Sequence, residues 1–127
     1  MKKRNVLYGI LMVIIMAGCS GSSDPTDDIF IANVSNAWTS NRNSRFLFNA
    51  DKNDVSQSNF NGEEDDKDGN VNNMNGAFNN YDIHFTFTDG AENGVTYTGK
   101  FVKGSNPLKM IVKGTNNITL TITKNSQ

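Results

Sequence analysis

The chain has 127 residues, of which 36% are apolar and 20% are charged, and its formal net charge is −1. This length accommodates one domain behind a short leader. The lack of a basic surplus argues against a nucleic-acid partner, because phosphate backbones are bound by clusters of lysine and arginine.

The N-terminus has the three-part layout of a secretory signal peptide. Basic residues 2–4 precede an uncharged apolar run at residues 6–16, and two small residues, Ala17 and Gly18, follow. The apolar run is shorter than the roughly 20 residues that a membrane-spanning helix requires. We therefore predict a signal peptide over residues 1–18, cleaved before Cys19, rather than a permanent transmembrane anchor.

The four residues Met16-Ala17-Gly18-Cys19 resemble the lipobox of bacterial lipoproteins, in which an apolar residue and two small residues precede a cysteine. Methionine takes the place of the more usual leucine at the first position. The resemblance implies that Cys19 is lipidated and becomes the first residue of the mature protein. Its partner is then membrane lipid, held by acyl chains at about 0.8 kcal/mol per buried methylene. The alternative is a plain signal peptide with an incidental cysteine. It leaves an exported thiol without a partner, since Cys19 is the only cysteine.

Residues 19–28 are small and acidic with one proline, a composition typical of a flexible tether. Ser20, directly after the cysteine, resembles the same position in lipoproteins that are sent to the outer membrane. The acidic residues that follow resemble those of surface-displayed lipoproteins in some Gram-negative groups. We therefore expect a lipid-anchored protein of the cell envelope, in the outer membrane, with its periplasmic or external side left open.

Residues 29–127 form the predicted domain, in which apolar and polar residues alternate with a period of two. This alternation predicts antiparallel strands with one buried face. Three Asn-Gly pairs, at residues 61–62, 75–76 and 93–94, are candidates for tight turns. The predicted strands are 29–31, 45–49, 55–61, 71–78, 81–87, 95–101, 108–112 and 118–123.

About eight such strands predict an all-β fold, a small antiparallel up-and-down barrel, with a β-sandwich as the alternative. The domain is too short for eight strands that cross a membrane. Trp38, the run 46–48 and the hairpin segments 83–87 and 97–101 resemble the lipocalin-like domains of small bacterial lipoproteins. That family often has glycine two residues before its tryptophan, where this chain has Asn36.

Few residues suggest chemistry. His84 is the only histidine and lies on the polar face of its strand, so neither a general base with a partner nor a zinc site is indicated. Glu64, Asp66 and Asp68 alternate before Gly69, as in a calcium loop, although the twelfth position is asparagine. A solvated hairpin loop is the alternative that we prefer.

Trp38 has two interpretations, a sugar-stacking platform on the surface or a buried plug at one end of a barrel. We favour the plug, because a single tryptophan near the start of an all-β domain is more often buried.

The function that we expect is binding or an envelope role without catalysis, and no cofactor motif is present. One hypothesis is a small apolar ligand in the barrel, or a structural role in the envelope. The alternative is a protein-interaction module, an adhesin or an inhibitor, that uses loops such as 61–75. The ligand hypothesis predicts a cavity lined by Phe46, Phe48, Phe85, Phe87, Tyr97 and Met110.

Overall fold

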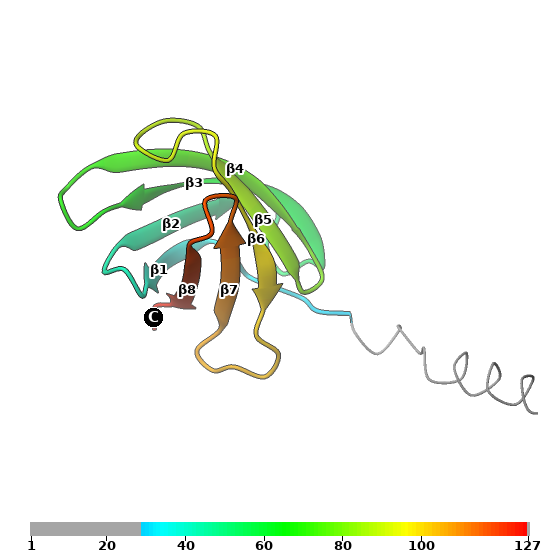
Figure 1. The fold of residues 1–127 in the computed structure, drawn as a ribbon. Helices are drawn as coiled ribbons and strands as arrows, with labels where there is room; N and C mark the ends of the chain where they lie inside the picture. The colour runs from blue at the N-terminus through cyan, green and yellow to red at the C-terminus, as the bar shows by residue number, and fades with distance from the viewer. Residues whose placement is uncertain (1–28, 127) are drawn as a thin grey trace, which may run out of the picture.

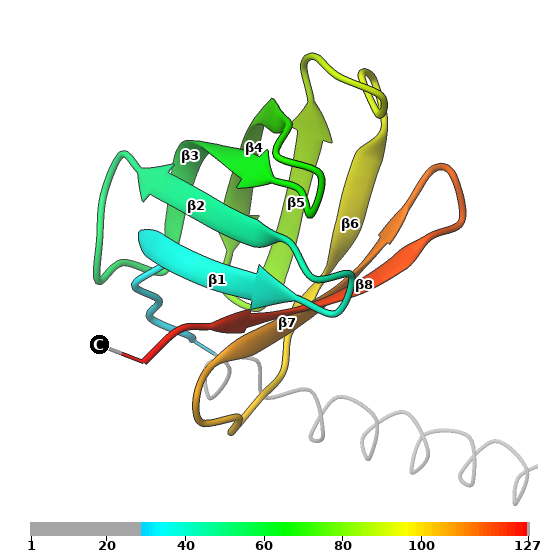
Figure 2. The ribbon, with the colours of Figure 1, turned by 90° about the vertical axis from the view of Figure 1, so that its left-hand side faces the viewer.

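The computed structural model describes residues 29–126, so the predicted signal peptide, Cys19 and the tether lie outside the described residues. Eight antiparallel strands follow one another around a closed barrel (Figure 1). The strands are β1 (Asn36–Ser40), β2 (Arg45–Ala50), β3 (Gln57–Asp65), β4 (Val71–Asn79), β5 (Asp82–Phe87), β6 (Thr96–Phe101), β7 (Lys109–Gly114) and β8 (Thr119–Lys124). Each strand pairs with the next, and β8 returns to pair with β1 (Figure 2). The predicted up-and-down barrel is confirmed. Within residues 29–126 no helix has the length and apolar character to span a membrane.

The first strand differs from the prediction. Residues 29–31 are not a strand, and this segment makes only an isolated bridge from Ala32 to Val55. The strand that completes the barrel is β1, which carries Trp38 as its one large buried side chain. Its sequence is too poor in apolar residues to show alternation, so pairing with both β2 and β8 decides its structure.

Two of the three Asn-Gly pairs lie inside strands rather than at turns. Gly62 and Gly76 occupy inward positions of β3 and β4, and only the pair at 93–94 forms a turn. A Cβ on Gly76 would lie 2.6 Å from Cζ of Phe60 and 2.7 Å from Cβ of Phe85. These glycines therefore make room for aromatic rings over the backbone of the two longest strands.

The barrel is filled by its own side chains. Phe85 stacks on Tyr97 with ring centroids 5.4 Å apart and lies 5.9 Å from both Phe46 and Phe87. All six side chains predicted to line a cavity are buried and point inward. Their rings contact one another, so these side chains form a packed core instead of the lining of the predicted cavity.

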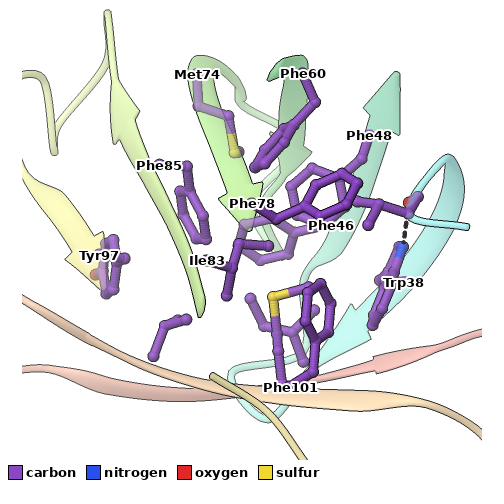
Figure 3. Close-up of a cluster of buried hydrophobic side chains, with 14 of the residues drawn as sticks. Trp38, Phe46, Phe48, Phe60, Met74, Phe78, Ile83, Phe85, Tyr97 and Phe101 are labelled. Atoms are coloured by element: carbon purple, nitrogen blue, oxygen red, sulfur yellow. Dashed lines mark hydrogen bonds between the residues drawn. The ribbon is translucent and has the colours of Figure 1, made fainter. Parts of the chain in front are cut away.

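Trp38 closes one end of the barrel, as the plug interpretation predicted. It is fully buried, and its Nε1 donates a hydrogen bond of 2.9 Å to the carbonyl oxygen of Val34 (Figure 3). Phe30 covers the same end by stacking on Tyr81 and contacting Phe101. The segment before β1 thus serves as a cap.

The backbone at Asn36, the first residue of β1, has a conformation that is unusual for a residue other than glycine. Its φ is +89°, in the left-handed region that favours glycine. Asparagine is one of the few other residues that tolerate this conformation.

Candidate functional site

The uncapped end of the barrel is surrounded by the four loops 41–44, 66–70, 88–95 and 115–118, which join β1 to β2, β3 to β4, β5 to β6 and β7 to β8. At this end the aromatic core gives way to hydrogen-bonded polar side chains. We call them the mouth cluster: Arg42, Ser44, Glu64, Glu92, Tyr97 and Asn116.

The centre of the mouth cluster is an ion pair between Arg42 and Glu64. Glu64 takes an inward position of β3, in phase with Phe60, and is only 2% exposed. Arg42 donates from Nε to one carboxylate oxygen at 2.8 Å and from Nη2 to the other at 2.7 Å. The hydroxyl of Ser44 donates to the same carboxylate. This paired geometry compensates the cost of burying the charge.

Glu92 joins this pair from the loop between β5 and β6. Its carboxylate accepts hydrogen bonds from Nη2 of Arg42 at 3.0 Å, from the hydroxyl of Tyr97 at 3.0 Å and from Nδ2 of Asn116 at 2.9 Å. The Tyr97 ring belongs to the aromatic core. The network therefore connects the core to three of the four loops.

The charges in the mouth cluster stabilise one another. Burial acts to lower the pKa of Arg42, but hydrogen bonds and attraction from Glu64 and Glu92 outweigh it and raise that pKa above its ordinary value. Burial acts to raise the pKa of Glu92, but hydrogen bonds from Arg42 and Tyr97 outweigh it and lower that pKa. Burial raises the pKa of the Tyr97 hydroxyl. All three groups are therefore held in their neutral-pH ionisation states.

A cavity of about 350 Å³ lies against the mouth cluster. One part of it is lined by Arg42, Ser44, Glu64, Ala91 and Glu92, and the other part is lined by Asp66, Lys67 and Asp68 of the loop between β3 and β4 and by Asn72 of β4. Carboxylates outnumber cations in this lining: Glu64, Asp66, Asp68 and Glu92 against Arg42 and Lys67. The cavity therefore has the size and charge to accept a cationic group.

The residues weighed for calcium do not converge. Glu64 faces Arg42, whereas Oδ1 of Asp66 accepts hydrogen bonds from the backbone amides of Asp68 and Asn70, both at 2.9 Å. Within the part of the chain that the structure describes, no group of three or more His, Cys, Asp or Glu side chains is placed to hold a metal ion. The calcium-like spacing thus forms a hydrogen-bonded turn.

His84 lies on the outer face of β5, opposite Thr98 of β6, and is exposed as the alternation predicted. The segment 61–75, which we expected to contain interaction loops, is mostly strand, because only residues 66–70 connect β3 and β4.

Arg42 and Glu92 were missed by the sequence analysis, because both lie in loops, away from any periodic pattern. Glu64 carried a usable signal. It falls on the inward phase of β3 together with Phe60 and Gly62, and an acid at a buried position requires a partner.

Comparisons with protein-family models, with curated proteins and with solved structures found no match to this chain.

Proposed function

We propose that this chain is a lipid-anchored lipoprotein of the bacterial envelope, attached through Cys19, and that its lipocalin-like barrel is a protein-interaction module. The partner is bound by the loops around the mouth cluster, and a basic side chain of the partner enters the cavity. The role is recognition rather than catalysis. The observation that carries this proposal is the contrast between a barrel interior filled with aromatic rings and a polar, hollowed mouth.

The filled interior favours the mouth over the barrel centre as the binding region. A carrier of apolar ligands needs a cavity among its apolar side chains. Here the rings of Phe46, Phe85 and Tyr97 contact one another in that place. An apolar ligand would have to displace these rings, at the cost of the stacking contacts that they make.

The arrangement of the mouth cluster favours a binding surface that is rigid before the partner arrives. Arg42 and Glu92 are held by several hydrogen bonds each, so the loops that carry them lose little conformational entropy on binding. The excess of carboxylates around the cavity attracts a basic segment and disfavours an acidic one.

Two measurements on the full-length protein test this proposal. Mass spectrometry of the N-terminal peptide is expected to find Cys19 acylated, and an unmodified Cys19 would refute the anchor. A photo-crosslinking amino acid at Ala91, which lines the cavity, is expected to capture a discrete protein partner in the bacterial envelope. The matched control is the same amino acid at Lys100, which is exposed on β6 near the end of the barrel opposite the mouth.

Native mass spectrometry of the detergent-solubilised protein separates this function from ligand transport. We expect no retained apolar compound. A stoichiometric apolar molecule, together with the absence of a crosslink from Ala91, would establish the carrier role in place of the interaction module.

A further inference from the structure

The outer surface of the barrel is chemically divided between two faces. The outward positions of β6 and β8 are mainly threonine and lysine, residues at home on an exposed strand surface. Among the outward residues of β2 to β4, six are asparagines instead: Asn49, Asn59, Asn61, Asn73, Asn75 and Asn79. We call Asn49, Asn59, Asn61 and Asn75, all exposed, the asparagine face.

The register aligns these asparagines across neighbouring strands. Asn49 of β2 is directly opposite Asn61 of β3, and Asn61 is directly opposite Asn75 of β4. The row continues to Thr86 of β5. Since paired strands lie about 4.8 Å apart, the row presents amide groups at a regular short spacing.

Asparagine is an unfavourable choice for these positions. It is depleted in strands, whereas threonine or valine would stabilise an exposed strand residue. Within residues 29–126 the side chains of Asn49, Asn59, Asn61 and Asn75 make no hydrogen bond that offsets this cost, unlike Asn73, whose amide donates to Asp89. A residue that has a poor strand propensity, and that gains no hydrogen bond within the fold, is expected at positions that serve function.

The asparagine face is also hollowed. Three open depressions, of about 660, 420 and 290 Å³, lie on it. The first shares Asn59 and Ala77 with the second, and it shares Asn61 and Asn75 with the third. Together they follow β3 and β4 as one elongated groove, with the small residues Gly76 and Ala77 along its floor.

We propose that the asparagine face binds a neutral glycan chain. Each amide both donates and accepts hydrogen bonds, which matches the paired donor and acceptor character of sugar hydroxyls. The amides are uncharged, and the charged lining residues Asp51, Lys52 and Glu63 are divided among the depressions, one or two in each. A neutral ligand therefore avoids the desolvation cost that a charged ligand would meet here without a partner.

The closed sheet argues against an extended peptide in this groove. Peptides that bind sheets usually add a strand to an open edge. The barrel has no such edge, because β1 and β8 are paired. Along the groove the amides of Asn59, Asn61 and Asn75 recur instead, which suits a repeating ligand whose affinity grows with the number of units in contact.

Affinity electrophoresis of the full-length protein in mild detergent tests the proposal. The gels contain dextran, mannan, xylan or a soluble β-glucan as neutral glycans, or polygalacturonate as a charged one. We expect retardation by at least one neutral glycan, and tighter binding of longer fragments of it. The double variant Asn61→Thr/Asn75→Thr should raise the dissociation constant at least about tenfold, because two amides lose their hydrogen bonds.

Threonine is a good strand residue, so this variant is expected to remain folded, which Trp38 fluorescence verifies. The single variant Asn49→Thr provides a second, milder test. The matched control, Thr98→Ala/Thr119→Ala on the opposite face, should bind like the unmodified protein. The proposal would be overturned if no neutral glycan retards the protein or if polygalacturonate alone does so. It would also be overturned if a neutral glycan retards the double variant as strongly as the unmodified protein. A crosslink from Asn61 to an envelope protein without any glycan retardation would overturn it as well.

Discussion

Replacement of Arg42 by alanine is expected to unbalance the charge at the mouth of the barrel. The carboxylate of Glu64 is 2% exposed and receives hydrogen bonds from Nε and Nη2 of Arg42 and from the hydroxyl of Ser44. In the variant only the Ser44 bond remains. A buried carboxylate without its counter-ion is among the strongest destabilising changes that a single substitution produces.

The magnitude follows from the burial of the two partners. Breaking a buried ion pair from one side costs about 3–5 kcal/mol. Arg42 is 29% exposed, so water reaches the space that it leaves, and we expect the lower end, about 3 kcal/mol. For a domain of this size that corresponds to a fall in the melting temperature of about 12–24 °C.

The assay is urea unfolding of the full-length protein followed by the fluorescence of Trp38, the only tryptophan and a buried one. The matched control is Arg45→Ala, whose side chain is 56% exposed and lies 3.7 Å from Asp65, so a change within about 1 kcal/mol is expected. Adding Glu64→Gln to Arg42→Ala removes the orphaned charge and should restore at least half of the loss. A loss below 1 kcal/mol for Arg42→Ala, or no recovery with glutamine, would refute the reasoning.

Three further predictions concern the barrel. Gly76→Ala places a methyl group 2.3 Å from the backbone carbonyl oxygen of His84 and 2.6 Å from the Phe60 ring, and it should cost about 2–3 kcal/mol in urea unfolding. Gly69→Ala, with open space around its positive φ, should cost about 1 kcal/mol, and equal costs would contradict this account. Trp38→Phe removes the hydrogen bond to Val34 and part of the plug, and calorimetry should show a loss of about 2 kcal/mol; an unchanged melting temperature would contradict it. The pKa of Glu92 is lowered on folding, so its stabilising contribution is present above the unfolded carboxyl value of 4.5 and is lost as pH falls through the folded value. The difference in urea midpoint between the unmodified protein and Glu92→Gln should therefore be largest at pH 7 and shrink below pH 4.5, and a difference that is constant with pH would contradict the assignment.

The strands that the sequence predicted best are those whose inward residues are large and whose outward residues are polar. In β5 the alternation of Ile83, Phe85 and Phe87 with polar residues makes one register favourable, because a shift by one residue would expose all three. β1 has no such series and was missed. The Asn-Gly pairs at 61–62 and 75–76 were wrongly predicted to be turns, for the opposite reason. Their local preference is for turns, but the pairing of Gly62 and Gly76 with neighbouring strands, where no side chain would fit, prevails.

The candidate site was less predictable than the fold. Local alternation could place Glu64 inside the barrel, but it could not identify the residue that neutralises it. Arg42 is 22 residues away from Glu64 and 50 residues away from Glu92 in the chain. Loop residues at such separations carry no periodic signal that would relate them.

The sequence by itself determined the all-β class, seven of the eight strands and the apolar face of most of them. These properties depend on neighbours within a few residues, and a period of two is visible in the chain. Only the tertiary structure decided that the barrel centre is filled, that Arg42, Glu64 and Glu92 meet at its mouth, and that Asn49, Asn61 and Asn75 form one row. Those properties depend on closure and register, which bring together residues that are distant in the chain.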